Sequence, residues 1–389
     1  KPRVRPADAR FSSGPCRKHP GWSLSALNTD HLGRSHRAAN PKAHLKSAID
    51  RSAALLKLPD GWKVGIVPAS DTGAFEMAMW SLLGSKPVDA FVWESFSSDW
   101  AKDLATLGLP ELNVHEADYG KLPNLEAASA DNDTVFVFNG TTSGVRVPNL
   151  DWISDDRTGL VLCDATSAAY AMAIDYSKID VLTWSWQKVL GGEAAHGMLA
   201  LSPRAVERLE NVPANRALPK IFTLTKKQAL IEGIFTGATI NTPSMLAVAD
   251  LHSALDWADQ SGGLAGLHAR SDANFQAIDS WVSQSPWAQW LADDVNTRSS
   301  TSMCLQITAP KFQSLSIDDQ QAGVKTMVGW LAEEGVAFDI ANYRSAPPGF
   351  RIWGGATVEA EDISALTAWL DWAYYRFEST VLNTEVQHG

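Results

Sequence analysis

Cysteine is scarce in this chain of 389 residues, which has only Cys16, Cys163 and Cys304. The three are far apart and odd in number, and Cys163 lies inside an apolar segment, which argues against a disulfide framework. We therefore expect a reduced, cytoplasmic protein. No cysteine or histidine spacing is typical of a zinc site, so no metal is expected.

Long apolar runs and excess positive charge are also missing. No segment approaches the roughly 18 consecutive apolar residues that span a membrane, so no membrane partner is expected. The basic residues Lys1 to Arg5 are not followed by the apolar core of a secretory signal. The net charge of -11 disfavours nonspecific nucleic-acid binding. The chain has no internal repeat, and its composition, 45% hydrophobic and 20% charged, is that of a globular protein.

Short apolar segments recur along the first two thirds of the chain, separated by helical or loop segments. They lack polar alternation, which is typical of strands in a sheet buried on both faces. We predict an α/β fold, with a large domain whose mostly parallel sheet is flanked by helices. Helices are expected over 40–58, with Asn40 as N-cap and Pro41 at the first position, and over 74–83. The expected strands are 63–67, 90–93, 112–115, 134–138, 159–163, 181–184 and 198–201.

The pattern changes after about residue 250, where longer helical stretches predominate. This change indicates a smaller C-terminal α/β domain packed on the large one. We predict a large domain over 16–255 and a small domain formed by 1–15 and 256–389. The expected helices are 242–258, 266–283, 318–334 and 359–377, and the expected strands are 302–307, 336–340 and 350–353.

Two charged residues end neighbouring apolar segments. Asp164 closes the segment 159–163, and Lys188 follows the segment 181–184, shortly before Gly191 and Gly192. A pyridoxal 5'-phosphate enzyme needs such a pair, because a lysine forms the Schiff base and an acid stabilises the protonated pyridine nitrogen. By itself, Lys188 is equally well explained as a solvated lysine at a strand end.

Other segments could complete such a site. Ser70-Asp71-Thr72-Gly73 opens a helix, and its free amides and hydroxyls can hold a phosphate. The turn 139–144 offers more hydroxyls, and Phe96 could stack on a ring. Each also fits an ordinary cap, turn or core residue. The segment 31–37 is locally basic in an acidic chain, which suits a small anion, although a solvated loop is the commoner explanation.

Taken in order, several motifs resemble those of the phosphoserine aminotransferases, which are class V aminotransferases of PLP fold type I. The resemblance covers nearly the whole chain. Each motif alone is weak, but their order along the chain follows that of the family. The motifs are Phe11-Ser12-Ser13-Gly14-Pro15, Ser35-His36-Arg37, Asp164-Ala165-Thr166-Ser167, Gln187-Lys188, Asn241-Thr242-Pro243 and Gly349-Phe350-Arg351-Ile352.

The resemblance implies a pyridoxal 5'-phosphate enzyme that works as an obligate homodimer with shared sites. Lys188 would be the Schiff-base lysine and proton shuttle, and Asp164 the partner of the pyridine nitrogen. The groups that hold the cofactor phosphate would be Ser70, Asp71, Thr72 and Gln187, joined by Asn241 and Thr242 from the other subunit. Phe96, Thr166 and either Thr141 or Thr142 would lie near the cofactor ring.

Substrate binding is implied for another set. Arg351 would clamp the α-carboxylate, for which a planar guanidinium is suited, and Ser13 would lie beside the substrate. His36 and Arg37 would bind the substrate phosphate across the dimer. The sequence departs from the family where Ala69-Ser70-Asp71-Thr72 lacks an arginine, and the segment 191–197 is longer than usual. Arg34 or Arg344 is expected to supply the missing charge.

These residues predict a phosphoserine transaminase of serine biosynthesis, which interconverts 3-phosphohydroxypyruvate and L-glutamate with O-phospho-L-serine and 2-oxoglutarate. Phosphohydroxythreonine, on the pyridoxine route, is a side substrate to consider. One alternative is an alanine–glyoxylate or serine–pyruvate transaminase, which would not need the His36-Arg37 pair. A cysteine desulfurase would need a cysteine in a mobile loop. A non-catalytic regulator on the same scaffold would carry an added basic segment, which this sequence lacks.

Overall fold

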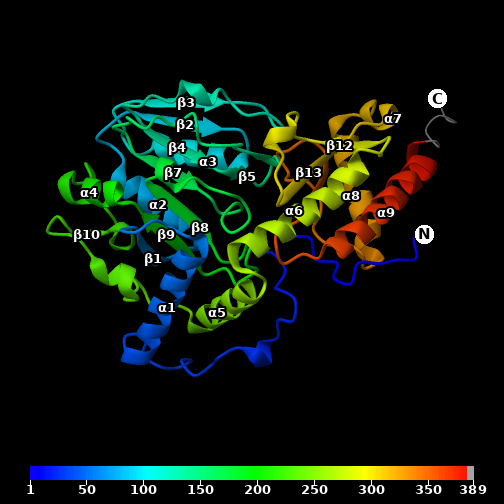
Figure 1. Ribbon diagram of the computed structural model, residues 1–389. Helices are drawn as coiled ribbons and strands as arrows, with labels where there is room; N and C mark the ends of the chain where they lie inside the picture. The colour runs from blue at the N-terminus through cyan, green and yellow to red at the C-terminus, as the bar shows by residue number, and fades with distance from the viewer. Residues whose placement is uncertain (383–389) are drawn as a thin grey trace.

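The computed structural model describes residues 1–382 of the chain, which forms a large and a small sheet (Figure 1). The large sheet has seven strands, and only β9 runs against the others, pairing antiparallel with β1 and β8. The expectation of a mostly parallel sheet is therefore confirmed. In spatial order the strands are β1 (Lys63–Pro68), β9 (His196–Leu201), β8 (Val181–Ser185), β7 (Val161–Asp164), β4 (Asp133–Val137), β2 (Val88–Val92) and β3 (Leu112–Glu116).

Helices cover this sheet, so its central strands are buried on both faces. Every residue of β2, β4, β7, β8 and β9 is buried. α2 packs against β8 and β9, and α3 against β2 and β4. The helices of this part are α1 (Ala39–Leu56), α2 (Ser70–Leu82), α3 (Ser95–Ala105), α4 (Pro203–Asn211) and α5 (Met245–Gln260).

The later part of the chain builds a three-stranded antiparallel sheet with helices beside it (Figure 1). The start of the chain also packs here, because the Trp353 N–H donates to the Phe11 carbonyl (3.0 Å) and Arg17 pairs with Asp362 (2.8 Å). The division into domains at residues 16 and 256 stays a prediction, and 383–389 lie outside the described residues. The elements are β12 (Ala288–Trp290), β13 (Ser302–Ile307), β14 (Gly349–Trp353), α6 (Gly263–Val282), α7 (Pro310–Gln313), α8 (Ile317–Glu333) and α9 (Ala360–Phe377).

The turn from β1 into α2 is tighter than the sequence suggested, since α2 begins at Ser70 and not at Ala74. Ala69 and Ser70 adopt left-handed backbone angles (φ 66° and 58°), which turn the chain directly into the helix. Such angles are strained for residues with a side chain and are common at functional sites. Gly73 permits the close approach, since a Cβ there would lie 2.1 Å from the Pro68 carbonyl oxygen.

Two other expectations about local structure were wrong. α1 begins at Ala39 with Ala38 as its N-cap, so Asn40 lies inside the first turn and is not the cap. The segment 336–340 is not a strand, because only Phe338 forms a single bridge, to Arg10 at the start of the chain. Among residues 1–382, no helix combines the length and the apolar character that crossing a membrane requires.

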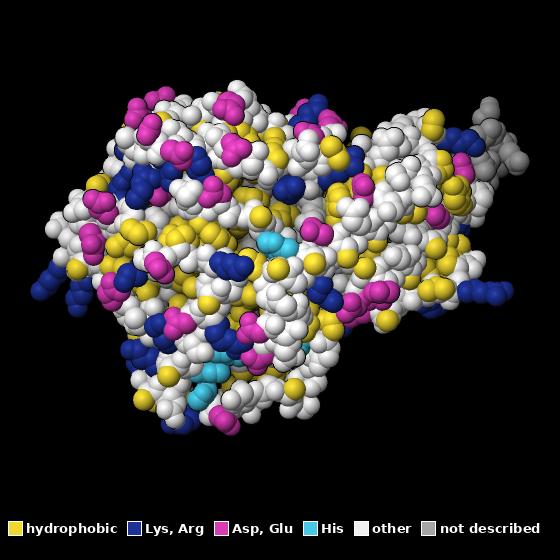
Figure 2. Space-filling model, viewed as in Figure 1, with side chains coloured by type: hydrophobic (Ala, Val, Ile, Leu, Met, Phe, Trp, Pro, Cys, Tyr) yellow, Lys and Arg dark blue, Asp and Glu magenta, His cyan; other side chains and the backbone are white. Residues whose placement is uncertain are grey.

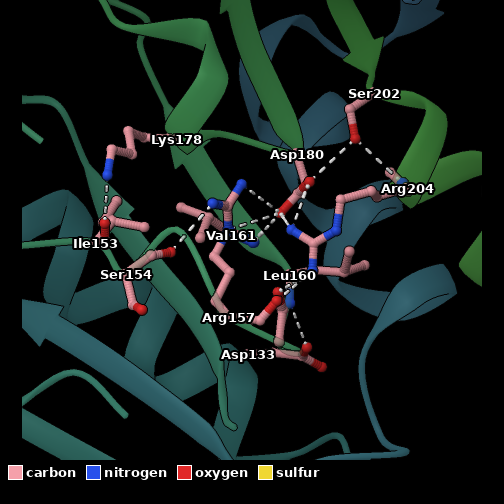
Figure 3. A network of polar contacts seen from close by, with 12 residues as sticks. Asp133, Ile153, Ser154, Arg157, Leu160, Val161, Lys178, Asp180, Ser202 and Arg204 are labelled. Carbon is pink, nitrogen blue, oxygen red and sulfur yellow. Dashed lines mark hydrogen bonds and ion pairs between the residues drawn. The ribbon is translucent and has the colours of Figure 1, made fainter. Parts of the chain in front are cut away.

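Buried charges at the amino edge of the large sheet are paired (Figure 3). Asp180 accepts hydrogen bonds from Arg204 (3.0 Å) and the Val161 backbone N–H (3.0 Å), and Arg157 lies within 3.5 Å. Asp133, at the start of β4, pairs with Arg208 (3.1 Å). These acids satisfy guanidinium groups and strand amides that would otherwise be buried without partners. The charges at this edge therefore stabilise the fold.

Candidate active site

A cavity of about 240 Å³ lies at the opposite, carboxyl edge of the large sheet. The ends of β4, β7 and β8 and the start of α2 meet there, as expected for an α/β sheet. Nine residues that the sequence singled out line it: Ser70, Asp71, Thr72, Phe96, Thr141, Asp164, Thr166, Gln187 and Lys188. Its remaining lining residues are Gly14, Pro15, Glu94, Trp100, Val137, Asn139, Ser167, Ser185 and Ala194.

Lys188 reaches into this cavity from the turn after β8. Its Nζ donates a hydrogen bond to the Ser13 carbonyl, and a Cβ at Gly14 would lie 2.5 Å from the same nitrogen. Glycine at position 14 therefore lets the N-terminal segment pass directly over the amine. Burial lowers the pKa of Lys188. A lowered pKa makes the neutral amine, which is the nucleophilic form, easier to reach.

Asp164 ends β7 and is only 7% exposed. Its Oδ1 accepts a hydrogen bond from the Thr166 backbone N–H (2.9 Å), and its Oδ2 accepts one from the Trp100 indole (3.0 Å). Both carboxylate oxygens are thus held in place by donors. The sequence analysis missed Trp100. Its position one turn after Phe96 on α3, which places both on the same helix face, was the available signal.

The start of α2 supplies hydroxyls and free amides to the same cavity. Gln187 Nε2 donates to Ser70 Oγ (3.0 Å), which joins the segment before Lys188 to this helix. Thr72 also lines the cavity. Asp71 differs, because its carboxyl is buried and faces Asp164. A phosphate can therefore bind the amides and hydroxyls here, whereas the Asp71 carboxylate would repel it.

Thr141 and Thr142, which the sequence left as alternatives, have different surroundings. Thr141 lines the cavity and donates from Oγ1 to Ser167 Oγ (2.9 Å). Thr142 is fully buried outside the lining and donates from Oγ1 to Glu94 Oε2 (2.7 Å). Thr141 is thus the one positioned to meet a ligand.

Glu94 is a second residue that the sequence analysis missed. Its Oε1 accepts from the Ser97 backbone N–H (2.7 Å), which caps α3, while its Oε2 binds Thr142. The carboxylate therefore ties the start of α3, which carries Phe96, to the turn 139–144, which carries Thr141. Phe96 lies at the cavity mouth, 39% exposed.

We expect Glu94 to make stability depend on pH. Burial raises the pKa of Glu94 to about 7 from its ordinary 4.5. The folded state then binds the proton more tightly, so this contribution is fully present below about pH 4.5 and is lost as pH rises through 7. Relative to Glu94→Gln, the unmodified protein should lose on the order of 3 kcal/mol between pH 4 and pH 8. Denaturant unfolding of both cofactor-free proteins across that range measures this, and a constant difference contradicts it.

Arginines from β14 and from the segment before it lie beside the cavity. Arg351, on β14, lies near enough to Lys188 to lower the pKa of that amine further. Its Nε is buried and has no hydrogen-bond partner among residues 1–382, and its Cζ is 5.8 Å from the Tyr343 ring centre. A guanidinium with an unused donor beside the lysine is suited to a carboxylate. Arg344 lines a neighbouring hollow with Ser95, outside the cavity.

Some expected site residues do not reach the cavity within one chain. Arg34 and Arg37 are exposed, and neither has a carboxylate partner within residues 1–382. Neither arginine lines the cavity, and neither do His36, Asn241 and Thr242. Basic and acidic side chains are interspersed on the face in Figure 2, with no large basic patch on it. No group of three or more acidic, histidine or cysteine side chains in the described chain could hold a metal.

Comparisons with known proteins are consistent with this site. No family model matches the chain. A phosphoserine aminotransferase of Methanosarcina mazei is 53% identical over 375 residues, covering 96% of this chain and 99% of the relative. The phosphoserine aminotransferase of Methanosarcina barkeri is 52% identical over the same length and coverage.

Solved structures share the fold. A phosphoserine aminotransferase from Cytophaga hutchinsonii superposes with a TM-score of 0.79 at 23% identity, covering 94% of this chain and 98% of the other. A PLP-bound phosphoserine aminotransferase from Trichomonas vaginalis has a TM-score of 0.72 at 16% identity, covering 94% and 99%. At these identities the two structures speak for the fold alone.

Proposed function

The chain belongs to the phosphoserine aminotransferases, and on that premise we propose how its residues carry out the reaction. The enzyme interconverts 3-phosphohydroxypyruvate and L-glutamate with O-phospho-L-serine and 2-oxoglutarate, a step of serine biosynthesis. The observation that carries the proposal is that Lys188 and Asp164, from adjacent strands, line one cavity. A half-reaction assay tests it: O-phosphoserine should change the absorbance of the bound cofactor, whereas serine or alanine should change it far less.

The cavity fits pyridoxal 5'-phosphate, the cofactor of this family. It offers a buried amine, a carboxylate held by two donors, and a helix start with hydroxyls, which match the aldehyde, the pyridine nitrogen and the phosphate. Lys188 would hold the cofactor covalently, with Ser70, Thr72 and Gln187 around its phosphate. When bound, the cofactor supplies an electron sink for the pair left when a substrate Cα proton departs.

The residues around the cofactor then have distinct tasks. Lys188 Nζ, favoured in its neutral form by burial, accepts and returns the Cα proton. The Asp164 carboxylate keeps the pyridine nitrogen protonated. Arg351 would bind the α-carboxylate with its unused donor, and Phe96, in the cavity lining, would pack against the cofactor. Thr141, fixed by Ser167, contributes a hydroxyl beside the ring.

We assign the remaining polar residues to the cavity of a second subunit. Arg37 and Arg34 are exposed and unpaired within the described chain, so their charges are available to a ligand phosphate. His36, Asn241 and Thr242 would join them across the dimer.

The three cysteines are buried and unpaired, which supports a reducing compartment such as the cytoplasm.

Arg37→Ala should identify the substrate class. A charge-assisted contact to a phosphate is worth about 1.5–3 kcal/mol, so KM for O-phosphoserine should rise roughly 10- to 150-fold. Any weak activity on alanine, which has no phosphate, should change little. Phosphohydroxythreonine carries the same phosphate, so if it is a substrate it should respond as O-phosphoserine does. Steady-state kinetics on the three amino acids measure this.

Mixed dimers test the shared site directly. Combining Arg37→Ala with Lys188→Ala subunits leaves one cavity per mixed dimer with both native residues. At O-phosphoserine concentrations below the raised KM of Arg37→Ala, activity should therefore increase on mixing. No increase in demonstrably mixed dimers contradicts the cross-subunit role. If the unmodified enzyme handles O-phosphoserine no better than alanine, another class V transaminase of the alanine–glyoxylate or serine–pyruvate type replaces the proposal.

A further inference from the structure

Asp71 is a buried acid whose chemistry conflicts with a phosphate-binding role. It is the second residue of α2 and lines the cavity, yet it is only 5% exposed. The Asp71 carboxyl group faces the carboxyl group of Asp164 and the hydroxyls of Thr166 and Thr183. Two carboxyl groups therefore meet at the wall of the cavity assigned to the cofactor.

The surroundings of Asp71 disfavour its ionised form. Other buried acids have cations: Asp133 pairs with Arg208, and Asp362 with Arg17. Asp71 has no ion-pair partner within residues 1–382, and its Oδ1 is buried without a hydrogen-bond donor. Burial is the largest cause that raises the pKa of Asp71, the neighbouring Asp164 raises it further, and the hydroxyls of Thr183 and Thr166 offset this only in part. An unpaired buried carboxylate is costly, and the group avoids that cost by keeping its proton.

Asp164 has the opposite environment, because the Trp100 indole and the Thr166 N–H both donate to it. When two acids are adjacent and only one of them has hydrogen-bond donors, the other is the one that keeps a proton. We propose that Asp71 is a positioning residue, which stays protonated and donates a hydrogen bond to the Asp164 carboxylate. This inference rests on the proposed role of Asp164 toward the pyridine nitrogen.

The donated bond would set how strongly Asp164 attracts a proton. Without this bond, the Asp164 carboxylate would interact more strongly with the proton on the pyridine nitrogen, which would shift the pH midpoint of the bound cofactor. The other ionisable groups around the pair come from neighbouring elements: Cys163 on β7, Lys188 after β8, His196 on β9 and Glu94 before α3. Burial lowers the pKa of both bases in this set, Lys188 and His196, so the pair has little positive charge nearby to neutralise it.

Comparing Asp71→Asn with Asp71→Ala isolates the hydrogen bond. The asparagine amide has the shape of the protonated acid and can donate to Asp164, whereas alanine cannot. The pH midpoint of the bound-cofactor absorbance should therefore shift by about 0.5–1 unit in Asp71→Ala and stay near the unmodified value in Asp71→Asn. The asparagine variant should also exceed the alanine variant in kcat by about 10-fold. Equal shifts in the two variants overturn the proposal.

A second measurement needs no cofactor or substrate, so it stays readable if the phosphoserine reaction fails. The unfolded chain loses the Asp71 proton near pH 4, while the folded chain keeps it. The melting temperature of Asp71→Asn minus that of the unmodified cofactor-free protein should thus grow as pH rises above about 4. A difference that is constant with pH means that Asp71 is ionised, and overturns the proposal.

Thr72→Ala serves as the matched control for a phosphate-binding role. Thr72 adjoins Asp71 on the same first turn and carries a hydroxyl that lines the cavity. Its removal should weaken cofactor binding, measured by equilibrium dialysis, without a shift in the absorbance midpoint. If Asp71→Asn instead loses cofactor as strongly as Thr72→Ala, Asp71 binds the phosphate end and the inference is wrong.

Discussion

Lys188→Ala should leave a folded protein whose turnover is lower by about 10²–10⁴-fold or more, because the amine both holds the cofactor and carries the proton. The fold should survive, since within residues 1–382 the side chain hydrogen-bonds only to the Ser13 carbonyl. The cofactor should still bind through its phosphate, but without a covalent link. Borohydride reduction, peptide mapping and steady-state kinetics measure these effects together.

Lys178→Ala is the control for this substitution. Lys178 lies before β8, where Nζ donates to the Ile153 carbonyl (2.8 Å) and pairs with Asp155, away from the cavity lining. Its removal should leave turnover and the reduced cofactor adduct in place. An adduct that maps to Lys178, or to any lysine other than Lys188, contradicts the assignment of the site.

Local sequence was enough to locate the strands of the large sheet, because most of them contain a run of consecutive apolar residues; β3 is the exception, since it alternates apolar and polar residues. β4 and β8 begin and end within one residue of the expected bounds. The beginning of α2 was not predictable in this way. It depends on left-handed angles at Ala69 and Ser70, which glycine adopts readily but these residues adopt only when the surrounding structure imposes them.

The candidate site was predictable where chemistry follows a strand end. Lys188, Asp164 and Gln187 stand directly after apolar strands, and the fold brings them to one edge of the sheet. Glu94 and Trp100 escaped notice because their importance comes from tertiary partners, Thr142 and Asp164, that are distant in sequence. For the same reason, nothing local distinguished Thr141 from Thr142.

Other residues lie beyond what local patterns and a single chain can settle. The segment 336–340 has the apolar composition of a strand, yet its pairing is limited to single contacts. Phe338 forms one bridge, to Arg10, and the Ile340 carbonyl accepts from the Arg351 N–H, so no ladder forms. Arg37 and Asn241 do not line the cavity of their own chain. Their assignment depends on the family resemblance and on a second subunit, which is why the mixed-dimer experiment is decisive for them.

Asp164→Asn should lower kcat far more than it weakens cofactor binding. The substitution removes the negative charge that favours a protonated pyridine nitrogen, while the phosphate contacts at Ser70 and Thr72 stay intact. A charge-assisted hydrogen bond is worth about 1.5–3 kcal/mol, which corresponds to roughly a 10- to 150-fold loss in kcat. Single-turnover kinetics and cofactor dialysis separate the two effects.

Trp100→Phe separates the charge of Asp164 from its orientation. The phenylalanine keeps an aromatic ring against Phe75 but removes the indole N–H that donates to Oδ2 (3.0 Å). Because the carboxylate keeps its charge and its bond from Thr166, the loss of kcat should be about 10-fold at most, the worth of one neutral donor. The loss of kcat in Asp164→Asn should be clearly larger than the loss in Trp100→Phe. If Asp164→Asn matches the unmodified enzyme, Asp164 is merely the acid that ends β7, and the electron sink needs another partner in the cavity.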